Sequence, residues 1–82
     1  MKTFDLCEKY NISHCTQKEI DTINKFRKDN TGKPVNVYYV TDSYIGYKII
    51  MTCDEPTKDE NGNFCFDACI DITDYNERLT SF

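Results

Sequence analysis

A change in hydrophobic periodicity near the middle of the chain is the feature that most constrains its fold. Before residue 30 the apolar residues follow a helical spacing, with Ile20, Ile23 and Phe26 on one narrow stripe. After Pro34 the sequence is rich in β-branched and aromatic residues, which favour strands. The chain therefore predicts an α+β fold in which helices cover one face of an antiparallel sheet.

Two N-terminal helices are predicted. The first covers Phe4–Tyr10, because two of its apolar residues are one helical turn apart. The second begins after Thr16, which forms a capping box with Glu19 three residues later. The segment Asp29–Pro34 ends this helix, since its glycine permits a C-terminal cap and its proline cannot continue a helix.

Three strands are predicted after the helices. Val35–Thr41 and Tyr44–Cys53 form a hairpin across two polar residues. The third strand, Phe64–Ile72, alternates apolar and polar residues and follows a strong turn signal at Asn61-Gly62. We thus expect the two helices to pack on a three-stranded antiparallel meander, with a short C-terminal helix that Asp74 caps.

The alternation of the third strand also predicts the core of a single small domain, residues 1–82. One face of that strand should pack against the second helix. The residues expected on this face are Phe64, Phe66, Ile70 and Ile72. A chain of 82 residues is long enough for one domain with a thin core.

The five cysteines are odd in number and irregularly spaced. The first residues contain no apolar segment typical of a signal peptide, so we expect a cytoplasmic protein, in the host cell cytosol, with reduced thiols and no disulfide framework. In one strand the Cα atoms of Cys65 and Cys69 would lie roughly 13 Å apart, too far for both to bind one zinc ion. We expect no metal and no other cofactor.

Catalytic motifs are not apparent. His14 is the only histidine, and its neighbour Cys15 cannot easily turn toward it to form a nucleophile and base pair. The sequence has no phosphate-binding loop and no nucleophile elbow. We therefore expect that the protein is not an enzyme.

Charge is distributed unevenly along the chain. Residues 1–41 contain seven basic and five acidic side chains, whereas residues 42–82 contain three basic and nine acidic ones. Between Asp54 and Glu77 there are eight acids and one lysine. Like charges gathered in this way repel one another and cost stability, so they favour a role in binding.

The predicted partner is a basic nucleic-acid-binding protein, with neither nucleic acid nor membrane contacted directly. Tyrosines near the first hairpin suit such a surface, because tyrosine gives rigid contact area with a polar tip. The candidate binding residues are Asp54, Glu55, Asp59, Glu60, Asp67, Asp71, Asp74, Tyr44 and Tyr47.

In its acidic segments, "CDEPTKDENGN" and "FDACIDITDYNE", the chain resembles small phage-encoded inhibitors of host defence, the anti-restriction and anti-CRISPR proteins. The resemblance is one of general character, namely a short, acidic, single-domain protein, and it rests on no motif. It implies a non-enzymatic inhibitor that imitates nucleic acid and occupies the nucleic-acid site of a defence effector.

Residues 6–28 also permit a different interpretation, a small helix-turn-helix or winged DNA-binding regulator. In this alternative Asn11 adopts the turn conformation, and the second helix presents basic residues such as Lys25 and Lys28 to DNA. Gln17 lies where this motif normally has a buried aliphatic residue, and the acidic second half would repel phosphates.

Overall fold

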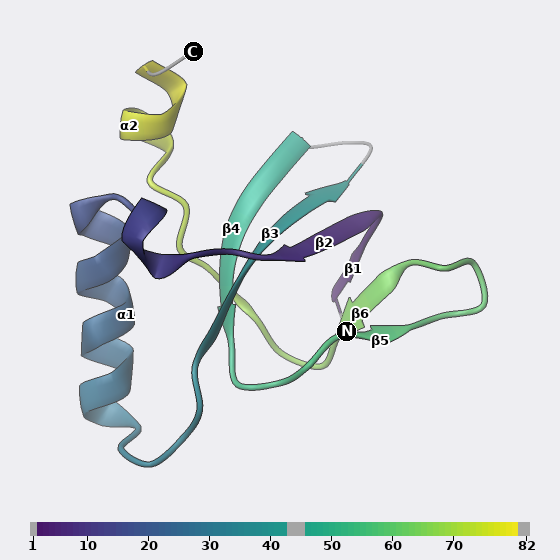
Figure 1. Ribbon diagram of the computed structural model, residues 1–82, viewed down its shortest axis with the longest axis horizontal. Coiled ribbons are helices and arrows are strands. Elements are labelled where there is room, and N and C mark those ends of the chain that lie inside the picture. Colours follow the sequence, from purple (N-terminus) through teal and green to yellow (C-terminus); the bar gives the residue numbers. More distant parts are fainter. Residues whose placement is uncertain (1, 43–45, 81–82) are drawn as a thin grey trace.

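The computed structural model describes residues 2–42 and 46–80, and a four-stranded antiparallel sheet lies at its centre (Figure 1). We call this the main sheet. Its strands, in spatial order, are β2 (Leu6–Lys9), β3 (Asn36–Asp42), β4 (Gly46–Thr52) and β7 (Ile70–Asp71). A second, small sheet lies beside it, with the spatial order β1 (Lys2–Phe4), β6 (Phe64–Phe66) and β5 (Thr57–Lys58).

Helices flank the main sheet on the side away from the small sheet (Figure 1). They are α1 (Gln17–Asp29), the short α2 (Tyr75–Thr80) and a 3-10 turn, η1 (Ile12–His14). The predicted capping box of α1 is confirmed, because the Thr16 backbone N–H donates to Glu19 at 2.9 Å and the Glu19 N–H donates to the Thr16 hydroxyl at 3.3 Å. The predicted end of this helix is also confirmed, at Asp29.

The prediction of a helix over Phe4–Tyr10 is wrong. Phe4 ends β1 and Leu6–Lys9 forms β2, which runs antiparallel to β3. Two further backbone bonds hold this segment along β3, from the N–H of Asp5 to Thr41 and from the N–H of Tyr10 to Val37. Pairing with a strand thirty residues later overrides the weak local helical spacing, and only one of the two predicted N-terminal helices exists.

The three-stranded meander is also wrong, and the structure is mostly β, with two sheets. The β3–β4 hairpin is confirmed, but Phe64–Ile72 is not one strand. The chain bends at Asp67 and Ala68, so β6 joins the small sheet and β7 joins the edge of the main sheet. The bend is fixed by the buried Thr52, whose hydroxyl donates to the Ala68 carbonyl at 2.7 Å.

The core is consequently divided in two by the main sheet. One cluster lies between the two sheets and consists of Phe4, Tyr38, Val40, Ile50 and Phe66. The other lies between the main sheet and α1 and consists of Ile23, Val37, Ile49, Met51 and Ile72. These two sets follow from the alternation of side chains along β3 and β4.

Only part of the predicted core faces α1. Ile72 does pack there, whereas Phe66 is buried on the opposite side of the main sheet. Phe64 is half-buried, and Ile70 is 46% exposed. The bend after β6 causes this difference, because it sends the two halves of the segment to different sheets.

An ion pair links the start of α1 to α2. The Glu19 carboxylate is fully buried and accepts hydrogen bonds from the Arg78 guanidinium, at 2.6 Å from Nε and 2.6 Å from Nη2. The Asp74 backbone N–H donates to the same carboxylate at 2.7 Å. The Arg78 guanidinium also lies 5.5 Å from the centre of the Tyr10 ring. Every polar atom of this buried carboxylate is therefore satisfied.

We expect this network to make the free energy of unfolding decrease at acid pH. Burial acts to raise the pKa of Glu19, but hydrogen bonds from Arg78, Asp74 and Thr16 outweigh it and lower the pKa below its usual value. Such a carboxylate stabilises the fold fully above its unfolded pKa of about 4.3, and the contribution is lost as pH falls through the lower folded value. Urea unfolding from pH 7 to pH 3 should show this decline.

The control for this measurement is Glu19→Gln, which cannot titrate at this position. It should be less stable than wild type at pH 7 and should lose less stability on acidification. An equal decline in the two proteins would show that other carboxylates cause the acid sensitivity.

Candidate functional site

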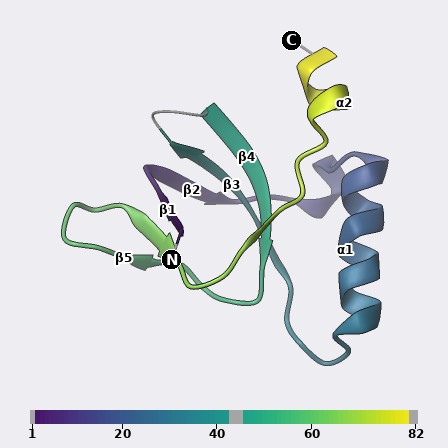
Figure 2. The same ribbon diagram turned by 180° about the vertical axis from the view of Figure 1, so that it is seen from behind.

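Acidic side chains are concentrated on residues 54–67, which we call the acidic hairpin. This segment contains β5, β6 and their connecting turn, and it projects from the body of the molecule on the side opposite α1 (Figure 2). Four of its acids are exposed and Asp54 is half-buried. The exposed four are Glu55, Asp59, Glu60 and Asp67.

The tip of the acidic hairpin is a hydrogen-bonded turn. The Asp59 carboxylate accepts hydrogen bonds from the backbone N–H groups of Asn61 and Asn63, both at 2.9 Å. Gly62 has φ +80°, a conformation that favours glycine, so the predicted Asn61-Gly62 turn is confirmed. Asp59 therefore shapes the turn as well as adding charge to it.

Three other acids of the hairpin have no such structural role. The side chains of Glu55, Glu60 and Asp67 form no hydrogen bond or ion pair with any residue that the structure describes. Their carboxylates are thus available to solvent or to a partner.

The remaining two predicted acids lie near α2 and not on the hairpin. Asp71 accepts hydrogen bonds from the Thr73 hydroxyl at 2.6 Å and the Tyr75 hydroxyl at 2.5 Å. Burial acts to raise the pKa of Asp71, and these hydrogen bonds lower it below its usual value. Asp74 is buried, accepts from the Thr16 hydroxyl at 3.1 Å and caps α2. Asp71 belongs to β7 and Asp74 directly precedes α2, so neither is part of the acidic hairpin.

Tyr47 belongs to a row of three tyrosines on the α1 side of the main sheet, which we call the tyrosine ladder. The Tyr39 ring stacks on Tyr47 with centroids 5.3 Å apart and on Tyr10 with centroids 6.4 Å apart. All three are half-buried, and α1 does not cover this end of the sheet (Figure 1). Tyr44, the other predicted anchor, lies outside the described residues.

Sequence reasoning missed two hollows. One, of about 180 Å³, lies between β1 and β4 and includes Lys2, Lys48 and Asp71 in its lining. The other, of about 230 Å³, lies where α1 meets the ends of β4 and β7, and its lining is mostly apolar. Each gathers residues from distant parts of the chain, so no local pattern in the sequence could have indicated it.

The cysteines form no disulfide in the structure. In the two described ranges, no three His, Cys, Asp or Glu side chains are placed to hold a metal ion. Burial raises the pKa of the Cys7, Cys15 and Cys69 thiols above the ordinary value. These three thiols therefore stay protonated near neutral pH and are weak nucleophiles.

The helix-turn-helix motif predicted in residues 6–28 is wrong, because Leu6–Lys9 is a strand of the main sheet and the first helix of the motif does not form. Within residues 2–42 and 46–80, neither the length nor the hydrophobicity of any helix is sufficient to cross a membrane.

Comparison with known proteins gave no relative for this chain: no protein-family model, no curated protein and no solved structure matches it. Its function must be argued from its own residues.

Proposed function

We propose that this protein is a non-enzymatic inhibitor that acts in the cytoplasm and binds the basic nucleic-acid-binding surface of another protein. The acidic hairpin is the main contact and imitates the charge of a nucleic acid. Several phage-encoded anti-restriction and anti-CRISPR proteins, which the chain resembles in general character, imitate nucleic acid in this way. The partner is a nucleic-acid-handling effector, and the protein competes with nucleic acid for it.

The observation that carries the proposal is the exposure of carboxylates on a projecting hairpin. The side chains of Glu55, Glu60 and Asp67 form no hydrogen bond or ion pair with a described residue, and gathering like charges on one segment costs stability. A negative field at a projecting position steers a basic partner and speeds the encounter. Tyr47 of the tyrosine ladder lies on the α1 side of the main sheet, so it provides a second, less polar contact that is separate from the hairpin.

The test is charge reversal at two exposed hairpin acids, Glu60→Lys/Asp67→Lys. The partner is first captured from cell extract and purified, and it must itself bind nucleic acid. The variant should then associate with it about tenfold or more slowly at low salt, because steering depends on opposite charge. The difference should shrink as salt rises, since exposed charges are screened over about 8 Å at physiological ionic strength.

The matched control is Asp5→Lys/Glu8→Lys, which changes the net charge equally at exposed acids outside the hairpin whose side chains form no hydrogen bond with a described residue. Asp71 is unsuitable for this purpose, because its hydrogen bonds to Thr73 and Tyr75 would be lost with its charge. Equal slowing by both variants would mean that net charge alone matters. No slowing by the hairpin variant would remove the hairpin from the mechanism.

A further inference from the structure

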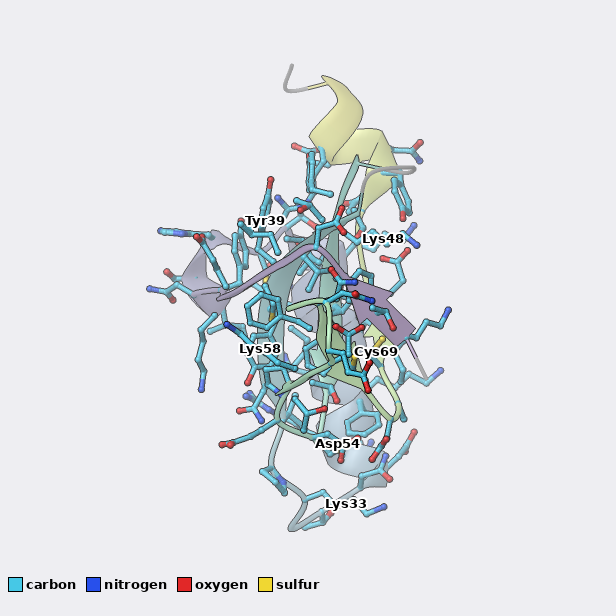
Figure 3. All side chains as sticks on the ribbon, turned by 90° about the vertical axis from the view of Figure 1, so that its right-hand side faces the viewer. Lys33, Tyr39, Lys48, Asp54, Lys58 and Cys69 are labelled. Carbon is cyan, nitrogen blue, oxygen red and sulfur yellow. The ribbon has the colours of Figure 1, made fainter. Side chains whose placement is uncertain are left out.

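The mostly apolar hollow beside α1, which we call the groove, has a volume of about 230 Å³. Ile70, in its wall, is 46% exposed although it is apolar. Figure 3 labels two groove residues, Asp54 and Cys69, and shows them well apart from Tyr39 of the tyrosine ladder. The lining residues that matter below are Phe26, Met51, Asp54, Ala68 and Ile70.

The groove is preformed, because a buried threonine ties two of its walls together. The Thr52 hydroxyl donates to the Ala68 carbonyl at 2.7 Å and accepts from the Asp54 backbone N–H at 3.0 Å. The side chain of Thr52 is 4% exposed, so water competes little for these bonds. A ligand therefore would not have to order these walls, which lowers the cost of binding.

The negative charge in the groove favours a cationic side chain as its ligand. Asp54 is the one charged side chain in the described lining, and it is half-buried. Its carboxylate forms no hydrogen bond or ion pair with a described residue. A carboxylate at the edge of an apolar surface matches a side chain with an aliphatic stem and a cationic end. The hollow between β1 and β4 contains two lysines, Lys2 and Lys48, against one acid, Asp71, so its net positive charge does not favour a cationic end.

We propose that the groove receives an arginine side chain of the partner, with its guanidinium at Asp54 and its stem against Met51 and Ile70. Arginine fits better than lysine, because its planar guanidinium binds a carboxylate through two hydrogen bonds, is less strongly hydrated and stacks on an aromatic ring such as Phe26. This inference rests on the proposed function and specifies it: the basic partner presents an arginine at this point.

The experiment compares labelled hexa-arginine and hexa-lysine peptides, whose charge is equal, by fluorescence anisotropy at low salt. The quantity of interest is the ratio of the two affinities in wild type, Asp54→Asn and Glu55→Gln. These variants remove the same charge from adjacent positions, but Glu55 does not line the groove. We expect Asp54→Asn to lower the preference for arginine about fivefold, and Glu55→Gln to change it less than about twofold.

Backbone amide chemical shifts give a second measurement. Hexa-arginine should shift the amides of Asp54, Ala68 and Ile70 in wild type and in Glu55→Gln, and much less in Asp54→Asn. Because the Asp54 side chain makes no bond within the described fold, Asp54→Asn should retain the native spectrum elsewhere.

The outcomes separate this inference from the proposed function. An equal arginine preference in the two variants, or no binding of either peptide, would overturn the groove as an arginine site. If the arginine preference is equal in the two variants but Glu60→Lys/Asp67→Lys weakens the binding of both peptides, the acidic hairpin remains a binding surface. If the preference depends on Asp54 but that double variant binds hexa-lysine as wild type does, the groove stands and the hairpin does not.

Discussion

Replacing Arg78 with methionine should destabilise the protein by about 3–5 kcal/mol, because it leaves the fully buried Glu19 carboxylate without its counter-ion. Methionine keeps most of the apolar stem, so the loss reports on the charge. A domain of this size has a free energy of unfolding near the lower end of about 5–15 kcal/mol. Urea unfolding at pH 7 should therefore find the variant barely folded.

The pH dependence of this loss identifies its cause. Without Arg78 the carboxyl group of Glu19 should prefer its neutral form, so its folded pKa should rise. The difference in the free energy of unfolding between variant and wild type should then decrease as pH falls from 7 to 4, because protonated Glu19 needs no counter-ion.

Arg27→Met is the matched control, because Arg27 is exposed on α1 and a surface change should cost less than about 0.5 kcal/mol. If the difference in the free energy of unfolding between Arg78→Met and wild type stays constant from pH 7 to pH 4, the loss comes from packing on Tyr10 instead.

Truncating Phe66 to alanine should cost about 3–5 kcal/mol, since its side chain is 1% exposed at the centre of the cluster between the two sheets. Its ring contacts those of Tyr38, at 5.4 Å between centroids, and Phe4, at 6.1 Å. Few other buried side chains join the small sheet to the main sheet. The cavity left by Phe66→Ala would therefore weaken the packing between the two sheets. Thermal and urea unfolding would measure the loss.

Phe64 provides the comparison within the same strand. It is half-buried, and the Lys58 ammonium lies 5.0 Å from the centre of its ring. Phe64→Ala should cost roughly 1 kcal/mol, as a partly exposed site does. If Phe66→Ala does not fold at all, Phe66→Leu should still be less stable than wild type. Equal losses at positions 64 and 66 would contradict the assignment of the core.

The elements that sequence predicted correctly are those determined by nearby residues. The Thr16 and Glu19 capping box, the β3–β4 hairpin and the Asn61-Gly62 turn each depend on a few adjacent positions.

The elements that sequence missed depend on contacts between distant residues. Nothing in Leu6–Lys9 indicates that it pairs with β3, and the alternation of Phe64–Ile72 cannot reveal a bend that Thr52 holds from another strand. The capping role of Glu19 was visible in the sequence, but its ion pair with Arg78 was not.

The candidate site was likewise predictable only where it depends on residues close together in the sequence. Charge counting located the acidic segment, but only the structure could show that the carboxylates of Asp71 and Asp74 accept hydrogen bonds from within the fold. The groove was invisible to sequence reasoning, because its lining comes from α1, β4 and the β6–β7 connection.

The pairing of β1 with β6 has a consequence for how the chain folds. Lys2 pairs with Phe66, so the first strand has its partner in the small sheet at the far end of the sequence. Closing the long loop between two such strands costs conformational entropy before the contact forms. Proteins rich in contacts between distant residues fold in milliseconds to seconds. During synthesis β1 therefore has no partner strand until β6 has been made. The α1 capping box and the β3–β4 hairpin depend on nearby residues and can form earlier.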